Sequence, residues 1–395
     1  MTTREAVIVA AKRTPVGRAK RGSLVYTRPE DMGKVVIDAL LRETGVDGKD
    51  VNDLLVGCAM PEGEQGMNLA RIVGYYSDLP QEVPAATVNR FCSSGLETIS
   101  IAAARIMAGF QDVVIAGGIE TMSMIPMGGN KIVGHPVIAR EMVEIYTTMG
   151  NTAELVLERY GKDFDLTREA LDRFSYESHM KAVTALAEGK FKEQCVPVPY
   201  VTWVDGKKVE GVLTEDEGPR GDTTLEALGG LKAAFKTKDG SVTAGNSSQM
   251  NDAASFVMLM TAEEAKRRKL PVLAFFRNYQ VVGVDPAVMG IGPAFAIPKV
   301  LEKAGVELKD VDLFEINEAF ASQALYSVRK LGIDPAKVNV NGGAIALGHP
   351  LGCTGAKLTT QLLYEMKARK SRYGIVSMCI GGGMGAAGLF ERPAA

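Results

Sequence analysis

The feature that most limits how this chain can fold is an internal repeat at a fixed offset. Residues 39–51 and 300–311 both read as the end of a helix, a glycine stop and a polar turn, and an apolar strand follows each. Three identities lie 260 positions apart: Gly45 and Gly305, Lys49 and Lys309, Asp50 and Asp310. Matches of several elements at one offset favour duplication over coincidence, so we expect two similar halves.

The same offset continues along the chain. Ser93-Ser94-Gly95 aligns with Cys353-Thr354-Gly355, and each cluster opens a helix-like stretch, at 96–107 and 356–366. A β-branched strand ending in glycines follows each helix, at 113–118 and 375–383. Such alternation with short connections is typical of a buried, mostly parallel sheet with helices on its faces. We therefore predict an α/β fold.

The segment between the repeats, about 120–243, differs from them. It has helix-like parts at 152–160 and 168–189 but also charged, loop-rich sequence around 204–220. We expect one half to comprise 1–119 plus 244–270, a loop domain to comprise 120–243, and the other half to comprise 271–395.

Composition excludes several classes of protein. A length of 395 residues exceeds what one core usually serves. The net charge is −2 and the basic residues are scattered, so we expect no nucleic-acid or membrane partner. The apolar run 6–11 is too short for a signal peptide. Five cysteines without a Cys-x-x-Cys pair argue against disulfides and zinc, and we expect a cytoplasmic protein.

Cys92 is a candidate nucleophile. It lies between an extended segment and a predicted helix, in Val-Asn-Arg-Phe-Cys-Ser-Ser-Gly. A thiol there is expected near the positive end of the helix dipole and near free backbone N–H groups, and both favour the thiolate. An isolated cysteine is more often a packing residue, so the role of Cys92 depends on its neighbours.

Three later residues could complete a catalytic site. His349 lies in a loop with five glycines between Gly342 and Gly355, and its ordinary pKa suits a general base. Cys379 ends the last predicted strand, before glycines whose N–H groups could form an oxyanion hole. Asn317 follows the strand 313–316 and could cap a helix or orient a water or a carbonyl. We interpret the remaining cysteines (58, 195, 353) as packing residues and the remaining histidines (135, 179) as surface residues. No Gly-Lys-Ser/Thr follows the glycine-rich loops, and no Gly-x-Gly-x-x-Gly follows a first strand, so nucleotide hydrolysis and dinucleotide redox chemistry are disfavoured.

Together these motifs resemble those of the thiolase family over essentially the whole chain. They are Asn89-x-x-Cys92-Ser-Ser-Gly, Asn317-Glu-Ala-Phe-Ala, Gly342-Gly-Ala-x-Ala-Leu-Gly-His349-Pro-Leu-Gly-Cys-Thr-Gly and Cys379-Ile-Gly-Gly-Gly-Met-Gly. Four ordered motifs of this length are very specific. The resemblance implies two duplicated βαβ-type halves, each with a mixed, mostly parallel sheet, layered αβαβα, and an inserted loop domain that binds coenzyme A.

The resemblance also implies the reaction, which is thiolytic cleavage of a 3-ketoacyl-CoA to acetyl-CoA and a shortened acyl-CoA. His349 would take the Cys92 proton, the thiolate would attack the keto carbon, and Cys379 would protonate the acetyl-CoA enolate. Coenzyme A, deprotonated with help from Cys379, would then remove the acyl group. One oxyanion hole would combine His349 with a water held at Asn317, and the other would use the N–H groups of Cys92 and Gly381. Coenzyme A is a substrate here, and no metal or permanently bound cofactor is expected.

Thiolase-like positions for coenzyme A fall mainly in the middle segment. Arg220 suits the anionic end of the molecule. The other implied contacts are Phe235 and Ser248, with Met149, Ala319 and Phe320 lining the channel for the thioester and pantetheine.

Details of the motifs favour the degradative subtype, the bacterial β-oxidation 3-ketoacyl-CoA thiolase (acetyl-CoA C-acyltransferase). Many acetoacetyl-CoA thiolases have His where this chain has Thr148, and Cys-Gly-Ser-Gly where this chain has Cys92-Ser-Ser-Gly. The segment Cys58-Ala-Met-Pro-Glu-Gly-Glu-Gln-Gly66 also resembles the degradative thiolases more than the acetoacetyl-CoA thiolases. The resemblance implies a homodimer or homotetramer, with a β-oxidation hydratase/dehydrogenase subunit as a possible partner.

Three alternatives remain at this point. An acetoacetyl-CoA thiolase (acetyl-CoA C-acetyltransferase) performs the same chemistry restricted to C4 substrates. A ketoacyl-synthase-like enzyme would oppose the nucleophile with two histidines, or with histidine and asparagine, which Cys379 argues against. A non-catalytic relative that binds coenzyme A or lipid would be expected to lose Cys92, His349 or Cys379, and all three are present.

Overall fold

The repeated sequences fold into two similar α/β halves in the computed structural model, which describes residues 4–394. The first half contains β1 (Ala6–Arg13), β2 (Gly17–Arg18), α1 (Pro29–Thr44), β3 (Asp53–Gly57), α2 (Leu69–Tyr76), β4 (Ala85–Val88), α3 (Ser94–Met107), β5 (Val113–Thr121), β8 (Asn251–Thr261) and α8 (Ala262–Arg268). The second half contains β9 (Ala274–Gly283), α9 (Pro293–Ala304), β10 (Leu313–Ile316), α10 (Ala321–Leu331), α11 (Ala344–Leu347), α12 (Leu351–Arg369), β11 (Tyr373–Ile380) and β12 (Met384–Glu391).

The repeat is visible in how equivalent helices end. α1 ends at Gly45 with φ 63°, and α9 ends at Gly305 with φ 66°. Residues with a Cβ are strained in this left-handed conformation, so glycine is the residue that the turn requires. The matching helices α3 and α12, and the strands β5 and β11 after them, also follow the predicted offset.

The strands form one hydrogen-bonded path in the order β10-β11-β12-β9-β1-β8-β5-β3-β4, with β2 paired to β8. The two halves join where Val7 and Ile8 of β1 pair with Phe275 and Ala274 of β9. The α/β class and the mixed sheet are confirmed. Parallel pairing is confined to β3–β4, β3–β5 and β10–β11, because β8 and β12 return antiparallel to their neighbours. At β12 this reversal takes the tight turn Gly381–Gly383.

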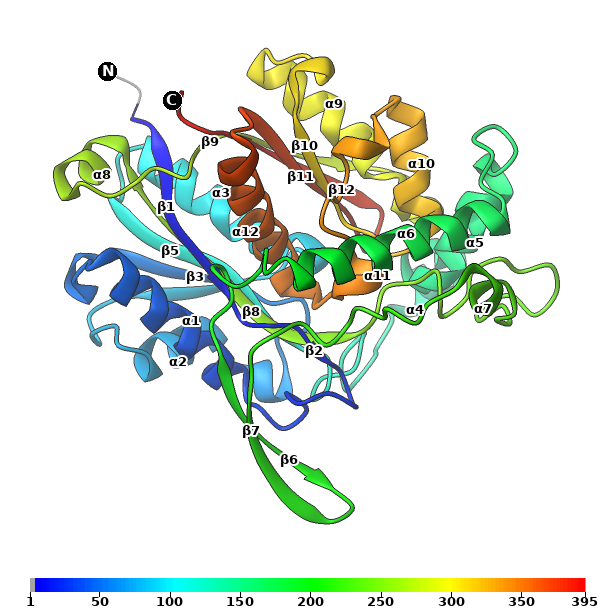
Figure 1. The fold of residues 1–395 in the computed structure, drawn as a ribbon, viewed down its shortest axis with the longest axis horizontal. Helices are drawn as coiled ribbons and strands as arrows, with labels where there is room; N and C mark the ends of the chain where they lie inside the picture. The colour runs from blue at the N-terminus through cyan, green and yellow to red at the C-terminus, as the bar shows by residue number, and fades with distance from the viewer. Residues whose placement is uncertain (1–3, 395) are drawn as a thin grey trace.

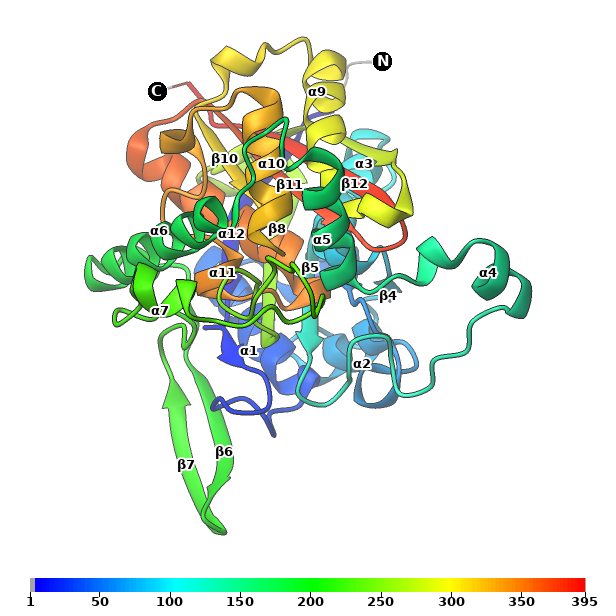
Figure 2. The same ribbon diagram turned by 90° about the vertical axis from the view of Figure 1, so that its right-hand side faces the viewer.

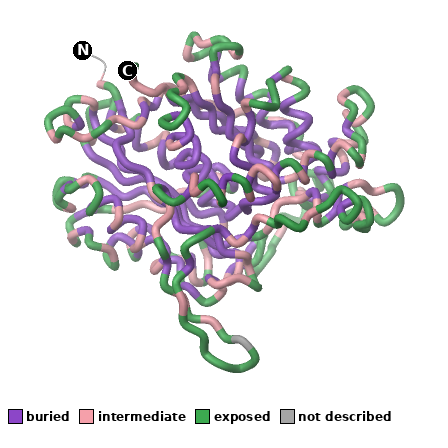
Figure 3. The backbone as a smooth tube through the Cα atoms, viewed as in Figure 1, coloured by how far each residue is buried: buried purple, intermediate pink, exposed green. Residues whose placement is uncertain are grey.

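Helices and strands form five layers, and the central layer is the one that positions the site. α1 and α2 cover the outer face of the first half, and α9 and α10 cover that of the second. α3 and α12 pack against each other between the two sets of strands, where they share one apolar core (Figure 1). Figure 3 shows these central elements as an almost continuous buried region.

The middle segment contributes α4 (Pro136–Glu141), α5 (Met149–Tyr160), α6 (Arg168–Ala187), β6 (Val198–Val204), β7 (Lys207–Leu213) and α7 (Leu225–Gly229). The predicted helices 152–160 and 168–189 are present as α5 and α6. The loop-rich expectation for 204–220 is wrong in part, because β6 and β7 form a hairpin that projects from the body (Figure 2). β7 is mostly exposed and three of its first four residues are charged, so its sequence shows no regular apolar alternation. The limits proposed for the three domains remain a prediction. None of the helices in residues 4–394 has both the length and the apolar stretch that a bilayer crossing needs.

Candidate active site

Cys92 lies in a short 3₁₀ helix, Phe91–Ser93, immediately before α3, and its side chain is buried. Asn89 shapes this turn, since its Oδ1 accepts the N–H of Phe91 at 2.8 Å and its Nδ2 donates to the Ala59 carbonyl at 3.1 Å. Phe91 takes φ 43°, a left-handed conformation that is costly for an aromatic residue. Asn89 is therefore part of the structure that holds the candidate nucleophile.

Glycines bring the N-terminal ends of α3 and α12 together beneath the site. A Cβ on Gly95 would lie 2.8 Å from the backbone N of Ala356, and a Cβ on Gly355 would lie 2.3 Å from that of Leu96. Backbone atoms cannot give way as a flexible side chain can, so these positions require glycine. The close approach places Cys92, on the first half, beside Leu351, two residues after His349.

The pKa of the Cys92 thiol is raised to about 12, chiefly by burial. The backbone N–H groups of Gly381 and of Cys92 itself act in the opposite direction and favour the thiolate. The N–H groups act in the direction that the sequence predicted, but burial outweighs them and the net shift of the Cys92 pKa is upward. Cys92 is therefore a thiol at neutral pH, and these same N–H groups are placed to stabilise negative charge that develops nearby.

His349 is buried and held at both ring nitrogens. Its Nδ1 lies 2.7 Å from Oγ1 of Thr354, and that hydroxyl donates its own proton to the Pro350 carbonyl at 3.1 Å. Thr354 therefore accepts from Nδ1–H, which leaves Nε2 without a proton and able to act as a base. Burial, with a smaller contribution from the cationic Lys357, lowers the pKa of His349 to about 3, so the imidazole is neutral at physiological pH.

Asn317 faces this base. Its Nδ2 lies 3.4 Å from Nε2 of His349, and its Oδ1 is buried without a hydrogen-bond partner among residues 4–394. A buried amide oxygen of this kind is suited to a water or a ligand hydroxyl. Asn317 does not merely cap α10, which begins at Ala321.

Cys379 ends β11 and is buried against Ala319 and Met289. Its thiol donates to Oε1 of Gln323 at 3.9 Å. Burial raises its pKa, and the neighbouring Cys92 raises it further. The two thiols are therefore close enough to influence each other, although they lie in different halves. The N–H of Gly381, two residues beyond Cys379, faces the Cys92 sulfur.

All the candidate contacts for coenzyme A line one cavity of about 650 Å³, which also reaches two of the candidate catalytic residues. Lining it are Cys92, His349, Met149, Arg220, Phe235, Ser248, Ala319 and Phe320. The Phe235 and Phe320 rings meet edge to face with centroids 5.9 Å apart. Gly150 lies so close to the Phe235 ring that a Cβ would be 2.2 Å from it, which fixes the ring on the cavity wall.

Several residues that the sequence did not single out hold the site together. Glu120 is buried on β5 and accepts the N–H of Gly352 in α12 and of Ala59, each at 2.8 Å, so it ties the two halves together. Glu318 accepts from Ser178 of α6 at 2.6 Å and from Ile345 in the His349 loop at 3.3 Å. The sequence could have indicated this role of Glu318, because it is the carboxylate next to Asn317 in the motif Asn317-Glu-Ala-Phe-Ala.

One earlier interpretation is wrong. His179 is not a surface residue: it is buried on α6 and its Nδ1 accepts the N–H of Arg220 at 3.2 Å. Ser93, next to Cys92, hydrogen-bonds the Tyr279 hydroxyl at 3.0 Å and does not line the cavity. His135 is exposed, as expected.

Comparisons with known proteins agree with this geometry. The thiolase N-terminal domain model matches residues 6–263, and the thiolase C-terminal domain model matches residues 270–392. The chain is 53% identical over 393 residues to a 3-ketoacyl-CoA thiolase of Bacillus subtilis (strain 168), covering 98% of this chain and 99% of that protein. It is 46% identical over 392 residues to the peroxisomal 3-ketoacyl-CoA thiolase of Homo sapiens, covering 98% and 91%. The crystal structure of the Bacillus anthracis acetyl-CoA acetyltransferase has a TM-score of 0.88 and 40% identity, covering 99% of each chain. This chain belongs to the thiolase family.

Proposed function

We propose that this thiolase cleaves 3-ketoacyl-CoA with coenzyme A to give acetyl-CoA and a shortened acyl-CoA, through an acyl group on Cys92. The observation that carries the proposal is a single cavity that reaches both the buried Cys92 thiol and the neutral His349 imidazole. The Cys379 thiol lies close enough to Cys92 to influence it, and the Gly381 N–H faces the Cys92 sulfur. These groups supply a nucleophile, a base, an acid and an oxyanion donor.

In the first step, Nε2 of His349 takes the proton from Cys92 and the sulfur attacks the C3 carbonyl of the substrate. The bond between C2 and C3 then breaks, and its electron pair leaves as the enolate of acetyl-CoA. Cys379 gives its proton to that enolate, which leaves a Cys379 thiolate. The buried Oδ1 of Asn317 suits a water that donates to the thioester oxygen beside His349.

In the second step, the Cys379 thiolate takes the proton from the thiol of coenzyme A, and the resulting thiolate attacks the acyl carbon on Cys92. The N–H groups of Cys92 and Gly381 point toward the Cys92 sulfur, which suits them to the oxyanion of the acyl group attached there. Cys92 then leaves as a thiolate and recovers its proton from His349. The raised pKa of Cys92 makes this thiolate a strong nucleophile when it forms.

Two observations support the degradative subtype: a residue that lines the cavity, and the sequence identities to known relatives. Thr148 lines the cavity, and its side chain is smaller than the histidine that many acetoacetyl-CoA thiolases have there, which leaves room for a longer acyl chain. The identity to the B. subtilis 3-ketoacyl-CoA thiolase, 53%, exceeds the 40% to the B. anthracis acetyl-CoA acetyltransferase.

A chain-length series tests this proposal against the restricted C4 alternative. Cleavage of acetoacetyl-CoA is compared with cleavage of 3-ketohexanoyl-CoA and longer substrates, and we expect kcat/KM to be higher for the longer ones. Cys92→Ala enzyme purified in parallel gives the blank for any contaminating thiolase. Activity confined to acetoacetyl-CoA would show that the protein is the C4-restricted thiolase and not the degradative one. If no substrate is cleaved, both proposals are refuted.

We also propose a cytoplasmic homodimer or homotetramer, with a hydratase/dehydrogenase subunit as a possible partner. All five cysteines are free, and a site that needs two thiols suits a reducing compartment. Light scattering during gel filtration gives the number of subunits, and a monomer would contradict this part of the proposal.

A further inference from the structure

The turn of residues 90–93, which carries Cys92, is strained and is held by side-chain hydrogen bonds. Phe91 takes φ 43°, and the residue is 38% exposed, so packing of its ring does little to offset the strain. Oγ of Ser94 accepts the N–H of Arg90 at 2.9 Å and donates to the Phe91 carbonyl at 2.7 Å. A strained turn keeps its shape only where its surroundings hold it, so each further contact on this turn bears on where the Cys92 sulfur lies.

One of these contacts comes from the other half of the protein. Tyr279 lies on β9, and its hydroxyl is 3.0 Å from Oγ of Ser93 and 2.6 Å from Oε2 of Glu97. Arg90 donates to both carboxylate oxygens of Glu97, at 2.6 and 2.9 Å, and a carboxylate paired in this way can only accept. The Tyr279 hydroxyl therefore gives its one proton to Glu97 and accepts the proton of Ser93.

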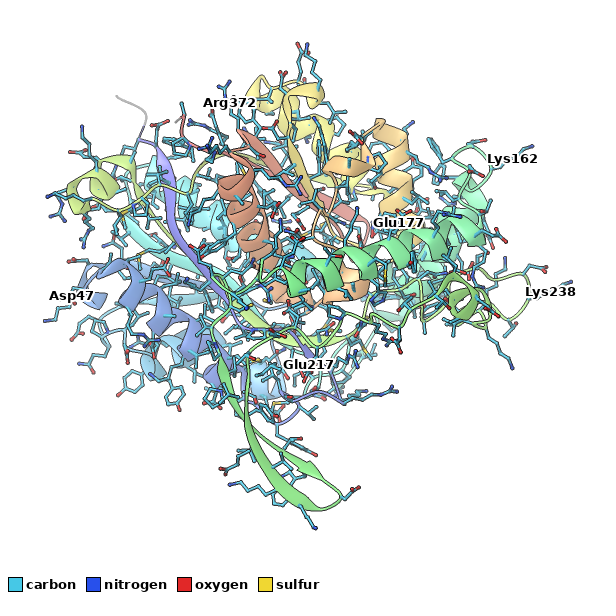
Figure 4. The ribbon with its side chains drawn as sticks, viewed as in Figure 1. Asp47, Lys162, Glu177, Glu217, Lys238 and Arg372 are labelled. Carbon is cyan, nitrogen blue, oxygen red and sulfur yellow. The ribbon has the colours of Figure 1, made fainter. Side chains whose placement is uncertain are left out.

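These four side chains close a ring over the turn. Arg90 is the first residue of the turn and Ser93 is the last, and Glu97 and Tyr279 connect them. The side chain of Glu97 is 13% exposed, unlike charged residues at the outside of the molecule such as Asp47, labelled in Figure 4, so water competes little for its bond to Tyr279. Burial and the Glu97 charge raise the pKa of the Tyr279 hydroxyl well above its usual value, so this hydroxyl keeps its proton at neutral pH.

Tyr279 also connects the turn to the sheet that carries Gly381. β9 pairs with β12, with Tyr279 opposite Gly388, and β12 begins three residues after Gly381. The N–H groups of Cys92 and Gly381 both face the Cys92 sulfur, although they belong to different halves. Their relative position therefore depends on how the two halves are aligned, and the bond between Tyr279 and Ser93 is a direct contact between the halves beside the sulfur.

We propose that Tyr279 is a positioning residue whose hydroxyl holds the Ser93 end of the turn, and with it the sulfur and the N–H of Cys92, in the geometry that acyl transfer needs. The inference rests on the proposed function, because it takes Cys92 to be the residue that is acylated. Tyr279 does not line the cavity, so it acts through Ser93 and not on the substrate. A displacement of about 1 Å at a reacting group can lower a rate about 100-fold, so the loss of one hydroxyl here should be visible in kcat.

The test uses Tyr279→Phe, which removes the hydroxyl and keeps the ring. Tyr364→Phe is the matched control, because both rings are half-buried against the same central core. The Tyr364 hydroxyl also reaches from the second half to the first, where it donates to the Ala11 carbonyl at 3.1 Å, but Tyr364 does not contact the turn of Cys92. Ser93→Ala removes the tested hydrogen bond from its other side, and the double variant Ser93→Ala/Tyr279→Phe completes a double-mutant cycle.

Three measurements are made on every variant. Rapid quenching followed by mass spectrometry gives the rate at which acetyl-CoA acylates Cys92, steady-state cleavage gives kcat and KM, and urea unfolding gives stability. We expect Tyr279→Phe and Ser93→Ala each to lower the acylation rate and kcat about 10-fold, with KM for coenzyme A unchanged. The double variant should lose no more than either single variant, because all three lack the same bond. Tyr364→Phe should keep wild-type rates even where it loses as much stability as Tyr279→Phe.

Three outcomes would overturn the inference. They are a Tyr279→Phe enzyme that keeps more than about half of the wild-type acylation rate, a loss equal to that of the Tyr364 control, and losses that multiply in the double variant. A wild-type enzyme that never acquires an acyl group on Cys92 refutes the proposed function instead. A wild-type enzyme that is acylated, but no faster than Tyr279→Phe, refutes the inference alone.

Discussion

The hydrogen bond between Thr354 and His349 can be tested directly. The Thr354 hydroxyl accepts Nδ1–H of His349 and so leaves Nε2 free to act as the base. Thr354→Val removes the only acceptor of Nδ1–H within residues 4–394 and keeps a β-branched side chain in the buried first turn of α12. Leaving a buried donor unpaired costs about 1–3 kcal/mol, and the upper part of that range applies once Nε2 has taken a proton and the ring is cationic. We therefore expect kcat to fall about 10- to 100-fold.

Thr359→Val is the matched control on the same helix. Thr359 is also fully buried, and its hydroxyl donates to the Gly355 carbonyl four residues earlier at 2.8 Å, as that of Thr354 does to Pro350 at 3.1 Å. The two substitutions differ in that only Thr354 also contacts His349. The difference between them isolates the histidine bond from the loss of a buried hydroxyl.

Two measurements decide the outcome. Steady-state cleavage of a 3-ketoacyl-CoA gives kcat, and the rate of Cys92 alkylation by iodoacetamide reports how readily His349 accepts the thiol proton. Both should fall in the Thr354 variant and stay near wild type in the Thr359 variant. If the Thr354 variant keeps more than about half of the wild-type kcat, or if both variants lose activity equally, Nδ1 does not need this acceptor and the assignment of Nε2 as the base fails.

Three further predictions follow from burial and charge at the site. Cys92→Ser should reduce turnover by at least about 1000-fold, because a serine hydroxyl is far harder to deprotonate than a thiol, while calorimetry still shows coenzyme A binding; near wild-type turnover would exclude Cys92 as the nucleophile. Cys379→Ala should still permit acylation of Cys92 by acetyl-CoA but should abolish exchange of the acetyl-CoA methyl protons with solvent, which NMR in deuterated buffer detects; undiminished exchange would assign the acid to another group. His179 has a pKa lowered to about 4 by burial from 6.5 in the unfolded chain, so it stabilises the fold above pH 6.5 and this contribution is lost as pH falls toward 4. The difference amounts to about 3 kcal/mol, and His179→Gln should lose correspondingly less stability between pH 6.5 and 4 in urea unfolding; identical acid sensitivity in both proteins would contradict the buried neutral state.

The fold was predictable because local signals and the repeat agreed. Gly45 and Gly305 mark the same turn in both copies, and their φ angles show why the residue recurs. The β6–β7 hairpin was missed because the charged residues of its turn and of β7 (Asp205, Lys207, Lys208 and Glu210) make the sequence after β6 resemble a loop. Strand direction was only partly predictable: β8 takes its antiparallel place beside β5 through long-range packing, whereas β12 turns back on β11 at the local turn Gly381–Gly383.

The candidate site was predictable in its residues but not in its electrostatics. Motifs named Cys92 and His349, whose proximity depends on the contact between α3 and α12. The net direction of the Cys92 pKa could not be read from the sequence, because it depends on how deeply both halves bury the sulfur. The burial of His179, and its contact with the backbone of Arg220, likewise arise from segments far apart in the chain.

The close approach of α3 and α12 at Gly95 and Gly355 has a consequence for the synthesis of the enzyme. Ribosomes make the first half before the second, so Cys92 leaves the ribosome some 250 residues before its base does, and a nascent or half-folded chain carries an unassisted thiol. Acyl transfer begins only when the later helix docks against the earlier one. Because a single added methyl group at either glycine would meet backbone atoms of the other helix, the site can form only when α3 and α12 are in close contact, and a chain that still lacks α12 has no His349 to activate Cys92.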